Sequence, residues 1–77
     1  MTLRLIHGWT PQIDEEVRIT ESGPSGYQLR RATITFIDDD PRAKYPVTVR
    51  VEQVNTQHRR FAVLWDLRWS EIEQVDQ

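Results

Sequence analysis

The chain has no cysteine among its 77 residues. This absence excludes disulfides, thiolate zinc sites and iron–sulfur ligation, and it removes the cross-links that hold many small secreted proteins together. The chain also has no stretch approaching the roughly 20 apolar residues of a membrane span, and the apolar run between Met1 and Trp9 is too short for a signal peptide. We therefore expect a soluble, cytoplasmic protein that does not insert into a membrane.

The chain also lacks an excess of positive charge, since its formal net charge is −2. A domain that binds nucleic acid mainly through its phosphates is usually basic, so the net charge argues against this class of partner. With 38% hydrophobic residues and three tryptophans, the composition is that of a globular protein. The length fits one domain over residues 1–77, with residues 1–14 as an N-terminal extension or an extra strand.

Patterns that carry enzymatic chemistry are absent as well. The acidic run Asp38–Asp40 lacks the spaced ligands, the glycine and the distal glutamate of a calcium-binding loop, so we interpret it as a turn. His7 and His58 have no partner ligand at short spacing. No serine lies in a nucleophile-elbow pattern, and no glycine-rich loop has the length and lysine of a phosphate site. We therefore predict no catalytic residues, no metal, no cofactor and no enzymatic activity.

The most informative pattern that is present lies between Asp38 and Glu52, where a turn leads into an alternating segment. Three valines share one face, and three polar residues point the other way: Val47, Val49 and Val51 against Thr48, Arg50 and Glu52. An alternation with period two is typical of a β-strand that has one side in a core and the other in water. This segment predicts an all-β fold.

Similar alternation recurs between turn signals along the chain, which predicts a single small β-barrel of five or six antiparallel strands. We expect further strands near residues 2–7, 16–20, 27–37 and 61–69. Within residues 27–37 the phase changes, so we expect a bulge or a sharp bend near Arg30–Arg31 that turns Ala32, Ile34 and Phe36 inward. A similar slip is expected at Gln53–Val54. Residues 70–75 fit either a last short strand or one turn of helix.

Three segments resemble the photosystem I reaction-centre subunit IV family, whose members are SH3-like barrels. The segment Lys44–Asn55 is similar to the family's central strand, Glu15–Ile19 to its opening strand, and Trp69–Val75 to its closing segment. The resemblance implies an SH3-like barrel. It also implies a non-enzymatic accessory subunit that docks proteins onto a larger complex, and ferredoxin docking is the specific version of this function.

Arginines on strands and loops are the candidate partner-binding residues, because a guanidinium group binds carboxylate or phosphate bidentately. Trp9 joins them as an aromatic anchor, although it equally fits a plug at one end of the barrel. The alternative for the arginines is a set of solvated strand faces balanced by Glu52, Asp66, Glu71 and Glu73. The candidate residues are Arg30, Arg31, Arg50, Arg59, Arg60, Arg68 and Trp9.

The leading hypothesis is therefore a protein-interaction module, a small accessory or adaptor subunit that binds a protein partner or a larger complex. The alternative is a small barrel that binds nucleic acid, with Arg30, Arg31, Arg59 and Arg60 on phosphates and Tyr27 or Trp9 stacked on a base. A further alternative is a structural protein of a larger assembly, such as a virion, that buries edge strands between copies. The sequence leaves the partner and the oligomeric state open.

Overall fold

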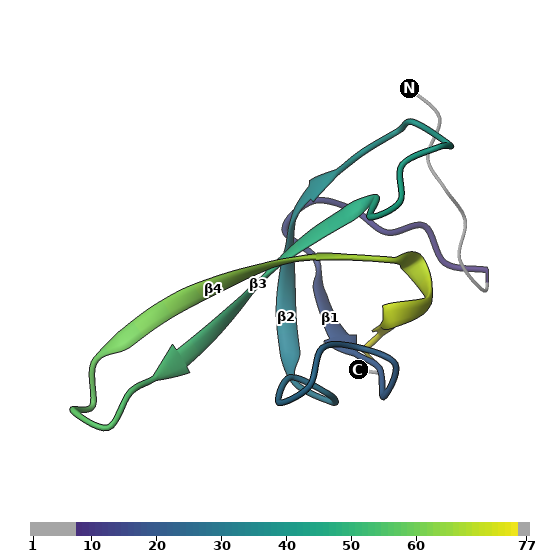
Figure 1. The fold of residues 1–77 in the computed structure, drawn as a ribbon. Helices are drawn as coiled ribbons and strands as arrows, with labels where there is room; N and C mark the ends of the chain where they lie inside the picture. The colour runs from purple at the N-terminus through teal and green to yellow at the C-terminus, as the bar shows by residue number, and fades with distance from the viewer. Residues whose placement is uncertain (1–7, 76–77) are drawn as a thin grey trace.

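The computed structural model describes residues 8–75, which form one five-stranded antiparallel sheet (Figure 1). The predicted all-β class is confirmed, and the strand expected near residues 2–7 lies outside the described residues. Within residues 8–75 there is no helix long and apolar enough to cross a membrane. The elements are β1 (Glu16–Ile19), β2 (Arg31–Ile37), β3 (Val47–Val54), β4 (Arg60–Leu67), the 3-10 turn η1 (Trp69–Glu71) and β5 (Ile72–Gln74).

The order of the strands in the sheet is β4-β3-β2-β1-β5. The first four strands therefore form a meander of hairpins, and β5 returns after η1 to pair with β1 on the opposite side from β2. This return rolls the sheet onto itself, as Figure 1 shows where the yellow segment lies beside β1. The topology is that of an SH3-like barrel, as predicted.

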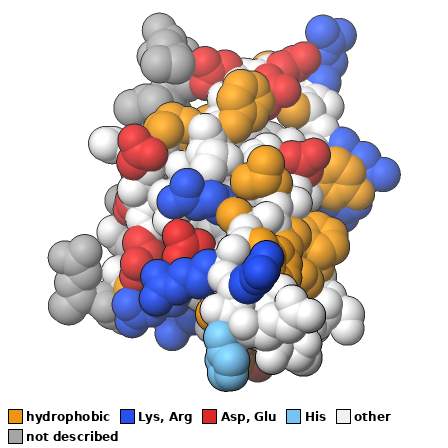
Figure 2. Space-filling model, turned by 90° about the vertical axis from the view of Figure 1, so that its left-hand side faces the viewer, with side chains coloured by type: hydrophobic (Ala, Val, Ile, Leu, Met, Phe, Trp, Pro, Cys, Tyr) orange, Lys and Arg blue, Asp and Glu red, His pale blue; other side chains and the backbone are white. Residues whose placement is uncertain are grey.

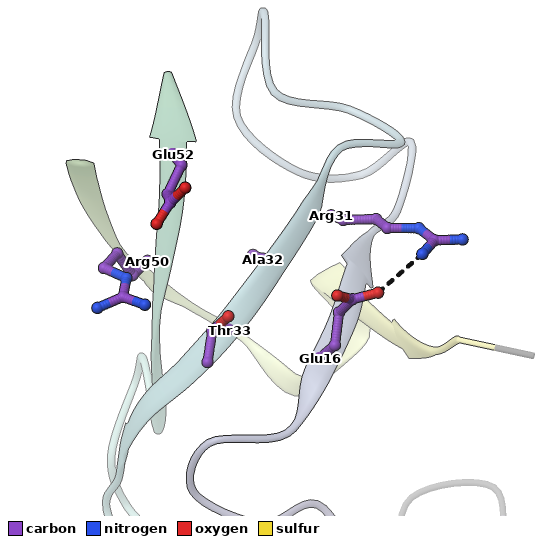
Figure 3. A pocket seen from close by; sticks show the side chains of 6 residues that line it. All are labelled: Glu16, Arg31, Ala32, Thr33, Arg50 and Glu52. Carbon is purple, nitrogen blue, oxygen red and sulfur yellow. Dashed lines mark hydrogen bonds and ion pairs between the residues drawn. The ribbon is translucent and has the colours of Figure 1, made fainter. Parts of the chain in front are cut away.

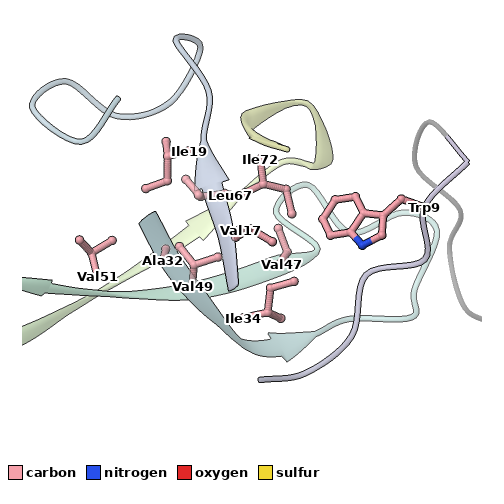
Figure 4. Close-up of a cluster of buried hydrophobic side chains, with 10 residues drawn as sticks. All are labelled: Trp9, Val17, Ile19, Ala32, Ile34, Val47, Val49, Val51, Leu67 and Ile72. Carbon is pink, nitrogen blue, oxygen red and sulfur yellow. The ribbon is translucent and has the colours of Figure 1, made fainter. Parts of the chain in front are cut away.

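The core lies on the concave side of the sheet and is built around the valines of β3 (Figure 4). Val47, Val49 and Val51 are all buried, which confirms the predicted alternation, and Arg50 between them is exposed. Burying one such side chain contributes about 1.5–3 kcal/mol to the free energy of folding. The three valines therefore supply a large part of the hydrophobic stabilisation that is available to a domain of this size. The other core residues are Trp9, Val17, Ile19, Ala32, Ile34, Leu67 and Ile72.

Two irregularities in β2 and the residues before it decide which side chains reach the core. Leu29 N donates to Ile19 O and Ile19 N donates to Arg30 O, so two residues face one, as in a bulge beside the predicted position. Leu29 has a φ of 63° and lies outside the strand, so the prediction of a strand from residue 27 was wrong. Tyr27 to Arg30 instead belong to the connection between β1 and β2.

The second irregularity lies between Ile34 and Phe36, where the register with β3 shifts. Ile34 pairs with Val49 on the buried face, whereas Phe36 pairs with Thr48 on the opposite face. Phe36 is therefore 57% exposed, and the prediction that it points inward was wrong. Thr35 is an extra residue in the pairing of β2 with β3. Because of it, the side chains that follow change sides of the sheet, and the alternation of the local sequence no longer predicts which of them are buried.

The β3–β4 hairpin extends well beyond the barrel and gives the molecule its long dimension, 43 Å against 25 and 21 Å (Figure 1). Its register is continuous from Val47 opposite Leu67 to Val54 opposite Arg60, so the slip predicted at Gln53–Val54 does not occur. The loop at its tip is closed by Asn55, whose Oδ1 accepts hydrogen bonds from the backbone N–H groups of Gln57 and Arg59.

The segment after β4 combines both structures that its sequence allowed, a helical turn followed by a short strand. The turn is closed by Glu71, whose Oε1 accepts a hydrogen bond of 2.8 Å from the backbone N–H of Arg68. The pair that closes the turn is therefore Arg68 and Glu71. Thr20 Oγ1 donates to Ser70 O and ties this turn to the residue that follows β1.

The alternation along β3 predicts opposite outcomes for two adjacent substitutions. Val49→Asp places a charge without a partner in the core and costs several kcal/mol, enough to prevent folding of a small domain. Arg50→Asp changes an exposed residue and alters the unfolding free energy by about 0.5 kcal/mol or less. Urea denaturation followed by circular dichroism measures both, and a cooperative, near-native transition for Val49→Asp would refute the register.

Candidate functional site

The convex face of the sheet, which we call the outer face, carries most of the strand-borne charges. Arg18 Nε lies 2.8 Å from Glu73 Oε1, and Arg31 Nη1 lies 2.9 Å from Glu16 Oε1. All four side chains are substantially exposed, so each pair contributes at most about 1 kcal/mol to stability. On β5, β1 and β2, acidic residues therefore balance the arginines, as the alternative interpretation of the sequence expected.

Arg50 differs from these neighbours because no acidic side chain within residues 8–75 lies at ion-pair distance from it. It is exposed on β3, opposite Thr33 of β2 and Leu64 of β4. A shallow hollow of about 180 Å³ lies beside it, lined by Glu16, Arg31, Ala32, Thr33, Arg50 and Glu52. In Figure 3 the Arg31 and Glu16 side chains meet each other, while Arg50 lies on the other side of Thr33.

Exposed apolar side chains flank Arg50 on the same face. Leu64, directly opposite on β4, is 63% exposed, and Phe36 lies opposite Thr48 one row away. Thr48, between Phe36 and Asp66 in the neighbouring row, donates through Oγ1 to Asp66 Oδ1 at 2.6 Å. We call the set Phe36, Thr48, Arg50 and Leu64 the Arg50 patch. An arginine beside exposed apolar groups is the composition found at the centres of protein interfaces.

The remaining predicted arginines lie elsewhere and do not join this patch. Arg30 is half-buried and donates through Nη2 to Glu52 O at 3.2 Å. Arg59 and Arg60 lie at the hairpin tip, and Arg68 places its guanidinium 5.6 Å from the centre of the Tyr45 ring. Lys44 approaches the same ring at 5.5 Å. The structure therefore divides the predicted arginine surface among the outer face, the hairpin tip and the Tyr45 end.

Trp9 belongs to the core, since only 8% of it is exposed. Its Nε1 donates to Glu15 Oε2 at 2.7 Å, and Glu15 Oε1 accepts from the backbone N–H of Gln12 at 3.1 Å. These bonds hold the segment before β1 over one end of the barrel. Of the two roles left open by the sequence, the plug is correct, and the prediction of Trp9 as a partner-binding residue was wrong.

Three residues of the Arg50 patch, Phe36, Thr48 and Leu64, were not among the predicted site residues. Leu64 could have been found, because the alternation of β4 places it on the face opposite Phe61, Val63 and Trp65. Phe36 could not have been found in this way, because its exposure depends on the register shift against β3.

Figure 2 views the molecule from the hairpin side and shows hydrophobic side chains directly beside lysine and arginine side chains.

The acidic turn before β3 uses its carboxylates for the backbone. Asp38 Oδ1 accepts from Asp40 N, and Asp40 Oδ1 accepts from Arg42 N, both at 2.9 Å. Among residues 8–75 there is no group of three histidine, cysteine, aspartate or glutamate side chains that could hold a metal ion. Asp38–Asp40 thus forms the turn that its sequence indicated.

Comparison with known proteins found no family model and no curated protein that matches this chain.

The plug role of Trp9 predicts a large effect on stability. Trp9→Ala removes a nearly buried ring and should lower the unfolding free energy by about 3–5 kcal/mol. Trp9→Phe keeps most of the apolar contact and loses the bond to Glu15, so it should cost about 1–2 kcal/mol. Thermal and urea denaturation measure both variants, and a Trp9→Ala protein as stable as wild type would contradict the burial.

Proposed function

We propose that the chain is a non-enzymatic protein-interaction module, a small accessory subunit that docks an acidic partner protein through the Arg50 patch. The observation that carries the proposal is the exposed Arg50 guanidinium, which has no acidic partner within residues 8–75 and lies opposite the exposed Leu64. A partner carboxylate would accept bidentate hydrogen bonds from this group, and apolar groups beside it would cover Leu64 and Phe36.

The arrangement of the other arginines favours this function over nucleic-acid binding. Arg18 and Arg31 already carry ion pairs on the outer face, and Arg59 and Arg60 lie on the hairpin tip, away from Arg31. A phosphate backbone is bound by a continuous basic track, which these positions and the net charge of −2 do not provide. An arginine with exposed apolar neighbours suits the docking of an acidic protein. Ferredoxin docking, implied by the resemblance in the sequence, is one form of this function.

Reversal of the charge at Arg50 tests the proposal. Arg50→Glu should lower the affinity for the partner by about tenfold or more, because two carboxylates would then face each other. Arg42→Glu is the matched control, since Arg42 is exposed on the turn after Asp40 and lies outside the strands that carry the Arg50 patch. Proteins retained by tagged wild-type and variant chains in the cells that naturally express them are quantified by mass spectrometry, and affinities are then measured with the purified partner.

Equal loss of the same partner from both variants, or from neither, would contradict the proposal. A parallel titration with single- and double-stranded nucleic acid at rising salt tests the alternative function. Tight binding that weakens steeply with salt and is abolished by neutralising Arg59 and Arg60 would overturn the proposal in favour of nucleic-acid binding.

A further inference from the structure

Strand β4 presents an open hydrogen-bonding edge. It lies at one end of the strand order, and no strand within residues 8–75 pairs with its other side. Asn55 N donates to Arg59 O at 3.0 Å, which makes this pair hydrogen-bonded. Hydrogen-bonded and non-hydrogen-bonded pairs alternate in an antiparallel ladder, so Phe61, Val63 and Trp65 direct their backbone groups toward β3. The backbone groups that point outward are those of Arg60, Ala62, Leu64 and Asp66.

The side chains of β4 do not protect this edge. Phe61 is 45% exposed, and between Arg60 and Asp66 the strand has neither a charge nor a proline. Edge strands that stay unpaired usually carry lysine, proline or a bulge in their middle. A hollow of about 470 Å³ is lined by Leu64–Leu67 together with Pro24, Tyr45 and Glu71. The hollow therefore borders the second half of the strand, from Leu64 onward.

The charges at the ends of this edge have no ion-pair partner within the described chain, although Asp66 Oδ1 accepts a hydrogen bond from Thr48 Oγ1. Neither Arg60 nor Asp66 forms an ion pair with another residue of 8–75, and both are exposed on the outer face. They lie six positions apart on one strand, with Val63 midway. An antiparallel copy of the same strand turned about Val63 would therefore bring each charge opposite its complement.

We propose that β4 pairs antiparallel with β4 of a second copy of this chain, about a two-fold axis at Val63. In this register Arg60 lies opposite Asp66 of the second copy, and Ala62 lies opposite its Leu64. On the concave face Phe61 lies opposite Trp65 of the second copy, an aromatic pair. All outward backbone groups from Arg60 to Asp66 then find partners, and the two sheets become continuous.

Two neighbouring registers also keep the outer faces of both copies on the same side of the joined sheet. Both pair the charged residues of the two β4 strands less favourably. An axis at Leu64 places Arg60 opposite Arg68 of the second copy, where like charges repel. An axis at Ala62 places Asp66 opposite His58 of the second copy, a residue of the hairpin loop with a φ of 61° that is not in a strand. The complementarity of Arg60 and Asp66 therefore selects the axis at Val63.

The proposed dimer does not depend on the function proposed above, because it uses the backbone edge of β4 and not the Arg50 guanidinium. It would place two Arg50 patches on one continuous outer face. The two proposals are therefore separable by experiment: Arg50→Glu should leave the dimer intact, and loss of the dimer should leave Arg50 exposed on each monomer.

Charge reversal and charge exchange test the register in solution. Sedimentation analysis should show the wild-type chain at twice its monomer mass, and Arg60→Asp or Asp66→Arg alone should each raise the dimer dissociation constant by about tenfold or more. The double variant with both changes restores the opposite pairs and should return the constant to within about threefold of wild type. Circular dichroism and thermal melting check that each variant is folded, which these exposed positions permit.

A single introduced cysteine tests the axis directly, because the chain has no cysteine of its own. At the axis, Val63 would face Val63 of the second copy as a non-hydrogen-bonded pair with Cα atoms about 4.5 Å apart, a separation that suits a disulfide. Val63→Cys should therefore form a disulfide dimer under mild oxidation. Ala62→Cys is the matched control, since its diagonal separation of roughly 7–8 Å is too long.

The proposal is overturned if the wild-type chain sediments as a monomer at about 1 mM, a concentration at which even a weak dimer forms. It is also overturned if the double charge exchange fails to restore a dimer that the single changes weaken. Equal cross-linking of Val63→Cys and Ala62→Cys, measured on a non-reducing gel, would exclude the axis at Val63.

Discussion

The row of buried valines on β3 is the constraint on which the rest of this structure depends. Val47 and Val49 have neighbours in both β2 and β4, and Val51 continues the row against Val63. Because side chains alternate across a strand, burial of this row fixes the side on which every other residue of β3 lies. The outward direction of Arg50, and thus the proposed docking patch, is a consequence of the packing of its two neighbours.

The same constraint explains why the hairpin is exposed. Beyond Val51 no residue of β2 pairs with β3, so the distal parts of β3 and β4 form a two-stranded arm without a core of its own. Tyr27 covers its base, where the Tyr27 and Trp65 rings pack edge to face at 5.1 Å and Gln53 Nε2 donates to the tyrosine hydroxyl. Past this point apolar side chains of the arm, Val54 and Phe61, remain exposed.

Residues whose environment is set by local alternation could be predicted from the sequence, and residues set by distant pairing could not. The valines of β3, the exposure of Arg50 and the turn at Asp38–Asp40 follow from patterns within a few residues. Phe36 fits the same alternation, yet a register shift against β3 turns it outward. The role of Trp9 required the contact with Glu15. A fold alone does not specify a function. The function implied by the resemblance to the photosystem I subunit IV family therefore stays a prediction.

Residue-resolved hydrogen exchange tests most directly whether the valine row holds the fold together. If it does, the amides of Val49, Arg50 and Val51 exchange only when the whole domain unfolds, and their opening free energy falls with denaturant as steeply as that of global unfolding. The amide of Thr56, at the tip of the hairpin loop, should exchange far faster. Exchange of the β3 amides through a smaller opening, while those of β1 and β5 remain protected, would contradict the account.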